Sequence, residues 1–464
     1  MNSLGGVIPM KNLLLGSVAL IACAGAVNAA DLPRMPVKAA PVPVISYDWN
    51  GFYLGGYFGD AINNSKAHTD PPGVAGTQLG VSRLNQKGFT AGAAVGYNWQ
   101  FAPHWLVGLE GDIGGLLLNR TNIEWNDNVL VGVKADWYAT ARGRLGYVTG
   151  PSLLYVTGGA AFVHIRDTFG GDGFTVGPLT NTTTKTGWTV GGGIETKLSR
   201  AWTAKTEYLF IDAGSSSFAS NPYASPGVPT TFDHSFHVIK TGLNYKIGEP
   251  FLEGLPLFGT STQLPSDHKW GGFYAGLNMG SGISNIRTIG GGGLVVAGSE
   301  QDVNGTGFAG GGQIGYNLMF GPKYFAGLEG DIGYLGVRGS EADWFDTSRT
   351  FASKTSWYGT ARVRAGSSTG PALLYVTAGG AWVNLTDTLT NGALASTSSR
   401  TAGGWTVGGG MEVALDARWS ARIESLYMDV GHRNLAVGIN NSDFKDRFTV
   451  VRAGVSYAFG NDLF

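Results

Sequence analysis

The stretch GFTAGAAVGYNWQFAPHWLVGLEGDIG, residues 88–114, decides the fold of this chain. On each side of the short segment FAPHW, apolar residues alternate with small or polar ones at a period of two. This period is typical of β-strands that present two different faces. In the second half, Leu109 and Ile113 fall on one face, whereas Glu110 and Asp112 fall on the other. The stretch therefore predicts two strands joined by a tight turn.

The same stretch returns later in the chain as GFAGGGQIGYNLMFGPKYFAGLEGDIG, which begins at Gly307, an offset of 307 − 88 = 219 residues. WYATARGRLGYVTGPSLLYVTGGAAFV from Trp137 likewise returns as WYGTARVRAGSSTGPALLYVTAGGAWV from Trp357, and GWTVGGGIE returns as GWTVGGGME. The repeated unit of about 200 residues is a whole domain, because solenoid repeats are only ~20 to 50 residues long. The sequence thus predicts two tandem modules.

About eight period-two segments can be counted in each copy, each near the ~9 to 11 residues of a membrane-spanning strand. Tight connections such as FAPHW, TGP and LSRAW alternate with long polar connections such as Asp60–Lys87 and Gly214–Asp233. Short turns on one side and long loops on the other are typical of the periplasmic and extracellular ends of outer-membrane barrels. The pattern predicts an all-β fold, an antiparallel transmembrane up-and-down β-barrel.

Composition agrees with strands in a membrane. Glycine supplies 75 of the 464 residues, which suits strands that curve around a narrow cylinder. Charged residues make up only 14%, and the net charge of −1 offers no basic surface for nucleic acid. We expect tryptophans near the strand ends to form interface girdles. The examples are Trp105, Trp137, Trp188 and Trp202.

Leu13–Ala30 is the one long apolar stretch, and it reads as a secretory signal peptide that ends at small residues. Cys23 lies in LIAC, which resembles a lipoprotein cleavage box, but a chance cysteine in the apolar stretch is the favoured interpretation. The predicted organisation is a signal peptide (1–29), a Pro/Ala-rich periplasmic segment (30–47), β-barrel module 1 (48–248), a linker (249–268) and β-barrel module 2 (269–464).

The motifs ADLPRMP, DWNGFYLGG, GYNW, LEGDIG, LLYVTGG and GWTVGGG, with closing strands in YKIG and YAFG, span nearly the whole mature chain twice. Together they resemble the small porin-family outer-membrane β-barrel proteins of alphaproteobacteria, in the OmpA-like barrel superfamily. This resemblance implies export to the cell outer membrane. The family normally carries one copy, so the tandem duplication is a departure from it.

The two copies could form two closed barrels or fuse into one sixteen-stranded barrel. Sixteen strands would enclose a water-filled channel, whereas eight leave only a filled interior. The copies are joined by GEPFLEGLPLFGTSTQLPSDHKW, which is much longer than the tight turns and contains Pro250, Pro256 and Pro265. Because prolines favour an extended linker over a hairpin, two barrels are predicted.

Charged residues on the predicted inner faces recur with the same sign in both copies. Ionised groups inside a narrow lumen must be paired, since isolated buried charges are strongly unfavourable. We interpret them as a structural ion-pair network, with a charged lining for a solute path as the alternative. The set is Glu110, Asp112, Arg142, Arg144, Glu195, Lys205, Glu207 and Lys240, with Glu329, Asp331, Arg362, Arg364, Glu412, Arg422, Glu424 and Arg452.

Enzymatic chemistry is not predicted. Some small outer-membrane barrels are enzymes with a histidine at the outer rim, and His164 would be the candidate. Its counterpart in the second copy is Asn384, and His104 is likewise matched by Lys323. No catalytic residue, metal ligand or cofactor is assigned from the sequence.

The predicted function is structural: an integral outer-membrane protein that supports envelope integrity and presents surface loops. The first alternative is a passive diffusion porin. The second is a protein that binds a surface ligand, such as haem or a host molecule, or a rim enzyme. Expected partners are outer-membrane lipid and lipopolysaccharide and the outer-membrane assembly machinery, with a loop ligand left unidentified and no nucleic acid.

Overall fold

A computed structural model describes residues 47–69, 79–123, 129–171, 178–218, 229–251, 266–290, 300–342, 349–437 and 440–460. The strands of module 1 are β1 (Gly51–Thr69), β2 (Leu79–Ala102), β3 (Trp105–Ile123), β4 (Val129–Thr149), β5 (Ser152–Gly171), β6 (Leu179–Lys197), β7 (Trp202–Phe218) and β8 (Thr230–Lys246).

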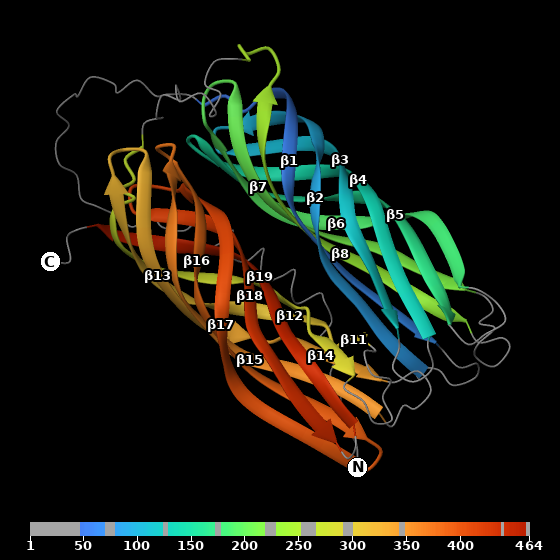
Figure 1. Cartoon of the computed structure of the whole chain (residues 1–464). Coiled ribbons are helices and arrows are strands. Elements are labelled where there is room, and N and C mark those ends of the chain that lie inside the picture. Colours follow the sequence, from blue (N-terminus) through green and yellow to red (C-terminus); the bar gives the residue numbers. More distant parts are fainter. Residues whose placement is uncertain are drawn as a thin grey trace, which may run out of the picture. The chain divides into compact units, whose positions relative to one another are not determined.

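Module 1 is a closed barrel (Figure 1). Each strand from β1 to β8 pairs antiparallel with the next one in sequence. The ring closes because β1 also pairs antiparallel with β8, with Tyr53 opposite Lys246 and Thr69 opposite Thr230. Closure removes the sheet edges, so the backbone groups of a spanning strand are satisfied without water.

Module 2 repeats the ring with three interrupted strands. Its strands are β9 (Gly272–Ser284), β10 (Arg287–Gly290), β11 (Glu300–Asp302), β12 (Gly305–Phe320), β13 (Tyr324–Leu335), β14 (Arg338–Ala342), β15 (Arg349–Ser368), β16 (Ala372–Asn391), β17 (Leu394–Ala414), β18 (Trp419–Val437) and β19 (Asn440–Gly460). The short β10, β11 and β14 continue β9, β12 and β13 and pair with β19, β10 and β15 respectively.

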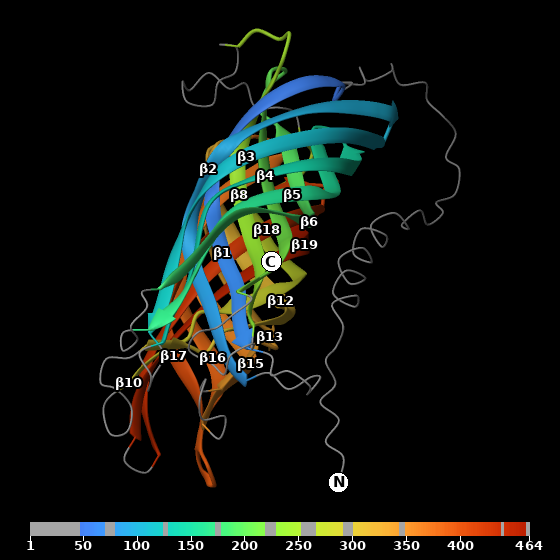
Figure 2. The same ribbon diagram turned by 90° about the vertical axis from the view of Figure 1, so that its right-hand side faces the viewer.

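The second ring closes when β19 pairs antiparallel with β9, with Phe448 opposite Ser284 and Val455 opposite Leu277. Counting interrupted strands once, each module therefore has eight strands in its own ring. The prediction of two modules of about eight strands is confirmed, and the single sixteen-stranded barrel is excluded. Figure 2 shows the tilted strands of the two rings from a second side.

The predicted strand length was wrong. The strands of module 1 contain 17 to 24 residues rather than about ten. The connections predicted as Asp60–Lys87 and Gly214–Asp233 are shorter than predicted. Within the first, β1 ends at Thr69 and β2 begins at Leu79; within the second, β7 ends at Phe218 and β8 begins at Thr230. Twenty residues span roughly 66 Å, far more than the ~25 Å apolar band of an outer-membrane barrel needs at a tilt of ~45°.

The outer surface near the short turns is apolar. Leu109 and Ile113 on β3 are 71% and 57% exposed, whereas the alternating Glu110 and Asp112 are 4% and 6% exposed. This confirms the predicted faces of the β3 segment. The period of two has placed the apolar side chains where lipid contacts them and the charged ones in the lumen.

Of the four tryptophans, two lie at strand ends and two lie within strands. Trp105 and Trp202 stand at the short-turn ends of β3 and β7, as predicted, although Trp202 is only 8% exposed. Trp137 and Trp188 instead lie within β4 and β6, because these strands continue beyond the lipid. Trp188 packs against Phe210 with ring centres 5.5 Å apart. We call the level of Trp137 and Trp188 the outer aromatic ring.

Beyond the outer aromatic ring, the interior changes from charged to apolar. A β-bulge between Ala135 and Trp137 shifts the register of β4. Val133 and Ala135, which precede the bulge, are buried inside, and Tyr138 and Arg142, which follow it, also face inward. A period of two read straight through the bulge gives the wrong face for the outer half of the strand. Each module thus holds a charged layer toward its turns and, toward its loops, a mainly apolar layer that also includes the buried Asp167 in module 1 and Asp387 in module 2.

The predicted signal peptide, Cys23 and nearly all of the Pro/Ala-rich segment lie outside the described residues, as do residues 252–265 of the predicted linker. Among the residues that are described, no helix has the length and apolar character needed to cross a membrane.

Candidate functional site

Arg142 is the centre of the charged layer in module 1. Its guanidinium on β4 contacts Glu110 at 2.5 Å and Asp112 at 2.6 Å, both on the neighbouring β3. It also reaches across the lumen to Glu207 on β7 at 2.9 Å. One arginine therefore links three carboxylates from two opposite parts of the wall. Its Nε donates to Thr140 at 2.9 Å, which fixes the plane of the guanidinium.

Two lysines share the same carboxylates. Lys205 Nζ donates to Glu110 at 2.7 Å. Lys240 Nζ contacts Asp112 and lies 3.2 Å from Glu207. Because each carboxylate is bonded by a cation from more than one strand, the ion pairs cross-link the barrel wall through its interior.

A second cluster lies nearer the short turns. Arg144 contacts Glu195 at 3.1 Å and Glu110 at 3.6 Å. The other oxygen of Glu195 accepts hydrogen bonds from Thr203 at 2.5 Å and Asn244 at 2.8 Å. The buried carboxylate of Glu195 is thus satisfied by neutral donors as well as by a charge, as a buried ion requires.

Module 2 contains the same arrangement, centred on Arg362. We call Arg142 or Arg362, together with its three carboxylates, the hub of its module. Arg362 contacts Glu329, Asp331 at 2.7 Å and Glu424 at 2.9 Å. Nε of Arg362 donates to Thr360 at 2.9 Å, as Arg142 does to Thr140. The hub was therefore kept while the two copies diverged.

The remaining cations of module 2 are all arginines. Arg364 contacts Glu412 at 2.9 Å, and Arg422 contacts Glu329 at 2.6 Å. Arg452 contacts Glu424 at 2.6 Å and also Asp331. Arg422 and Arg452 stand where module 1 has lysines, so the sign of the charge is retained and the shape of the cation is not.

The structure brings together all sixteen charged residues proposed from the sequence, eight in each lumen. All are buried, with Asp331 the most exposed of them at 8%. Each module contributes four carboxylates and four cations, so 4 − 4 = 0 and each network is neutral. Neutrality and mutual contact are what permit such groups to lie inside a narrow barrel.

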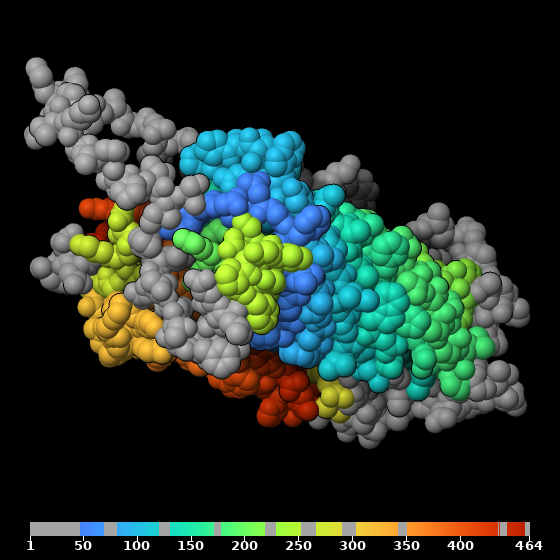
Figure 3. Space-filling view, turned by 90° about the horizontal axis from the view of Figure 1, so that it is seen from above, coloured from blue at the N-terminus to red at the C-terminus, as the bar shows by residue number. Residues whose placement is uncertain are grey.

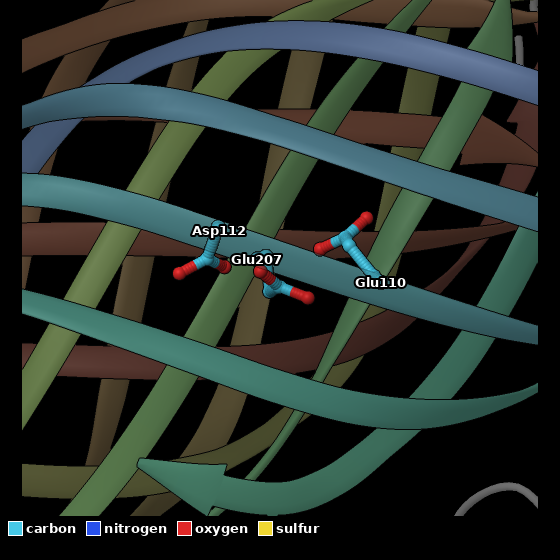
Figure 4. Close-up of side chains that lie close together, drawn as sticks. All are labelled: Glu110, Asp112 and Glu207. Atoms are coloured by element: carbon cyan, nitrogen blue, oxygen red, sulfur yellow. The ribbon is translucent and has the colours of Figure 1, made fainter. Parts of the chain in front are cut away.

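Three of the carboxylates meet closely enough to suggest a metal site. Oxygens of Glu110, Asp112 and Glu207 lie within 4.8 Å of one another, and their side chains converge in the lumen (Figure 4). The guanidinium of Arg142 contacts all three carboxylates. A cation is thus already built into this position, and the donor set does not call for a metal.

Sequence reasoning missed the buried tyrosines of the network. Tyr53 donates to Glu110 at 2.6 Å, and Tyr155 donates to Glu207 at 3.1 Å. In module 2, Tyr274 donates to Glu329 at 2.6 Å. The available signal was a tyrosine at an inward position opposite a glycine. A Cβ on Gly96 would lie 2.2 Å from the Tyr53 hydroxyl, so only glycine leaves room for that ring.

A small pocket lies at the short-turn mouth of each lumen. The pocket of module 1 has a volume of about 20 Å³ and is lined by residues that include Glu195 and Asn244. The corresponding pocket of module 2 has about 10 Å³. These volumes hold about one water molecule. Figure 3 shows the outer surface of module 1, in blue to green, as a continuous surface in the view from above.

His164 does not form a catalytic group with its neighbours. It lies on the outer surface of β5, stacked on Trp137 with ring centres 5.8 Å apart, and it contacts Thr184 at 3.2 Å. His104 lies at a short turn and bonds the Val148 carbonyl at 3.0 Å. Within the part of the chain that the structure describes, neither histidine forms an ion pair with a carboxylate.

A closed antiparallel barrel with an apolar outside and a charged interior defines an integral outer-membrane β-barrel protein. The sequence profile of the family "Outer membrane protein beta-barrel domain" matches residues 17–246 and again residues 255–459. The chain belongs to this family, in a tandem form, and it lies in the outer membrane. The resemblance stated from the motifs is therefore confirmed.

Two relatives show the extent of the similarity. The 31 kDa outer-membrane immunogenic protein of Brucella melitensis is 31% identical over 247 residues, which cover 51% of this chain and 100% of the relative. The 22 kDa outer membrane protein of Rhizobium leguminosarum bv. viciae is 33% identical over 215 residues, which cover 44% of this chain and 86% of the relative. Both are outer-membrane proteins, and each matches about half of this chain.

Solved structures resemble the chain only distantly. Neisserial surface protein A covers 42% of this chain and 97% of its own, with 15% identity and a TM-score of 0.23. A Pseudomonas aeruginosa FadL homologue covers 88% of this chain and 90% of its own, with 10% identity and a TM-score of 0.28.

Proposed function

We propose that the protein is a structural element of the outer membrane, which anchors surface loops on two rigid, closed barrels and does not conduct solutes. The observation that carries this proposal is the filled lumen. Arg142 and Arg362 each contact three carboxylates across the barrel. The charged groups around each arginine are in contact with groups of opposite charge.

The apolar layer adds a second barrier on the same path. In module 1 it includes Leu118, Val133, Ile165, Phe169 and Phe236, all nearly inaccessible to solvent. A hydrated solute would have to displace these side chains and then break buried ion pairs. Both steps are unfavourable, which argues against the diffusion-porin alternative.

Planar-bilayer recording of the purified full-length protein tests the proposal. The expected result is insertion without steady conductance. Insertion is checked independently by heat modifiability on a detergent gel, where the folded barrel migrates faster than the boiled protein. Stable, uniform channels at every insertion event would contradict the structural role and favour the porin.

A second measurement ties any conductance to the lumen. The double variant Arg142→Ala with Arg362→Ala removes the centre of both networks, and small or flickering currents are expected where the parent shows none. A parent that conducts as well as this variant would mean that solutes cross by a path other than the two lumens.

A further inference from the structure

In each module the pairing between two neighbouring strands ends at the outer aromatic ring. β6 pairs with β7 only from Trp188 to Lys197, whereas its pairing with β5 continues to Leu179. In module 2, β17 pairs with β18 only from Trp405 to Ala414 and continues along β16 to Leu394. The outer parts of β6 and β17 are therefore paired on one side only, whereas β5 and β16 stay paired with β4 and β15 along their whole length.

The same local turn separates the strands in both modules. Gly214 on β7 has a φ of 72°, and its N–H donates to the side chain of Asp212 at 2.9 Å. Gly431 on β18 has a φ of 87°, and its N–H donates to Asp429 at 3.0 Å. A positive φ favours glycine, so the Asp-x-Gly sequence sets the point at which β7 and β18 turn away.

The outward face of the β5–β6 hairpin and of the β16–β17 hairpin is a row of paired polar side chains, which we call the hydroxyl ladder. In module 1, His164 contacts Thr184 at 3.2 Å and Arg166 Nε donates to Thr182 at 3.2 Å. The ladder of module 1 consists of His164, Arg166, Thr168, Thr180, Thr182 and Thr184.

Module 2 carries the ladder at the same register. Thr388 and Thr397 are 3.1 Å apart, and Asn384 donates to Thr401 at 3.3 Å. Thr386 also bonds Ser399. We call each cross-strand pair of the ladder a rung. Every described rung includes a hydroxyl group in both copies of the domain.

The ladder begins where the lipid contact ends. At the base of the module 1 hairpin, Phe162 and Trp188 are 37% and 42% exposed, and in module 2 Trp382 and Trp405 are 45% and 52% exposed. Aromatic girdles lie at the level of the lipid headgroups. The ladder is continuous with this lipid-facing surface, so it stands at the level of the sugar and phosphate groups of outer-leaflet glycolipids.

The two ladders differ in charge at one rung. Arg166 is exposed on β5, and its counterpart on β16 is Thr386. Lys134 on β4 lies beside Arg166 in the sheet and also bonds Asp136 at 2.8 Å. No ion pair of Arg166 occurs within the described part of the chain. A guanidinium in this position can bind phosphate through two parallel hydrogen bonds.

We propose that the hydroxyl ladder of module 1, with Arg166 at its centre, binds the phosphorylated sugar headgroup of an outer-leaflet glycolipid. The threonine hydroxyls bond the sugar, and Arg166 bonds the phosphate. The ladder of module 2 has the hydroxyls without the arginine, so it lacks the phosphate contact. The inference deepens the proposed structural role, because a bound glycolipid would join the barrel to its leaflet.

A reciprocal exchange between the modules tests this. The full-length protein is refolded in detergent and titrated with purified lipopolysaccharide, and the bound glycolipid is counted by native mass spectrometry. Arg166→Thr gives module 1 the rung of module 2, and about tenfold weaker binding is expected, because a hydrogen bond to a charged group is lost. Thr386→Arg gives module 2 the rung of module 1, beside Lys354, and a second bound glycolipid is expected.

Two further ligands distinguish binding of a glycolipid from binding of a free anion. Lipopolysaccharide stripped of its phosphates should bind the parent as weakly as it binds Arg166→Thr. Pyrophosphate should compete only at a large excess. Heat modifiability of each variant confirms that the barrels are folded.

Equal binding of intact lipopolysaccharide by the parent and Arg166→Thr would overturn the proposal, and so would no gain in Thr386→Arg. Displacement of the glycolipid by equimolar pyrophosphate would make free phosphate the ligand. Each of these outcomes is independent of conductance, so the failure of this inference is distinguishable from failure of the structural role.

Discussion

The ammonium group of Lys240 lies 4.3 Å from the centre of the Tyr57 ring. In module 2 both positions differ: Arg452 replaces the lysine, and Asn278 replaces the tyrosine. The hydroxyl of Tyr138 donates to Tyr57 at 2.9 Å in module 1. The two modules therefore fill the same part of the lumen in two ways, a smaller cation with a large ring or a larger cation with a small amide.

Exchanging this pair should show strong coupling. Lys240→Arg alone places a larger cation against Tyr57 and should destabilise module 1 by about 1–3 kcal/mol, because the lumen is already filled. Tyr57→Asn alone removes a buried ring and should also destabilise it. The double variant should recover roughly 0.5–3 kcal/mol relative to the sum of the two. Urea unfolding in detergent measures each, and strict additivity would show that the two positions do not share space.

Removing the hub should be far more damaging than removing a surface charge. Arg142→Ala leaves Glu110, Asp112 and Glu207 short of their shared cation, and a loss of roughly 3–5 kcal/mol is expected for a buried pair broken from one side. Arg362→Ala should have a similar effect in module 2. The measurement is the urea midpoint of the heat-modifiable band.

Lys354→Ala is the matched control for the hub variants, since Lys354 is exposed on the outer surface of β15. Its urea midpoint should equal that of the parent. A midpoint as low as that of Arg142→Ala would mean that the interior position of the charge is not what makes the hub important. Lys66 is a poorer control, because it lies within β1 rather than in a loop.

Glycine at one lumen position should be indispensable. Gly96→Val places a side chain into the ring of Tyr53, whose hydroxyl would be 2.2 Å from the new Cβ. Displacing Tyr53 also breaks its hydrogen bond to Glu110. We expect loss of the heat-modifiable band, whereas Gly56→Val should retain it, because nothing lies within 4 Å of a Cβ built at that position. Equal refolding yields for the two variants would contradict the packing of Tyr53.

Each module should fold without the other, because β1 and β8 close the first ring. Residues 30–248 expressed alone should refold in detergent into a heat-modifiable barrel, with a urea midpoint close to that of module 1 in the full chain. Aggregation of this half under conditions in which the whole chain refolds would show that closure requires module 2.

Much of the architecture could be predicted from the sequence. The repeat gave the number of modules, and tight turns such as FAPHW separated the strands correctly. The inner and outer faces followed from period two on β3, where Leu109 and Glu110 alternate. These features are local, since a turn and a strand face depend on neighbouring residues only.

The outer halves of the strands could not be predicted in the same way. The bulge at Asp136 exchanges the inner and outer faces of β4, and the turn at Gly214 bends β7. Neither feature can be recognised in an alternating sequence pattern. The apolar layer was missed because inward apolar residues such as Val133 look lipid-facing when the register is not shifted. The charged residues could be named from their recurrence in both copies. Their partners across the lumen, such as Arg142 and Glu207, required the closed ring.

The charged layer also has a bearing on how a module enters the membrane. Tyr53 of the first strand and Lys240 of the last strand both bond carboxylates of β3. A module with only some strands inserted would leave those carboxylates facing hydrocarbon without partners, which is strongly unfavourable. Closure supplies the missing partners together. The ion pairs thus make a partly inserted sheet much less stable in the membrane than a fully closed barrel.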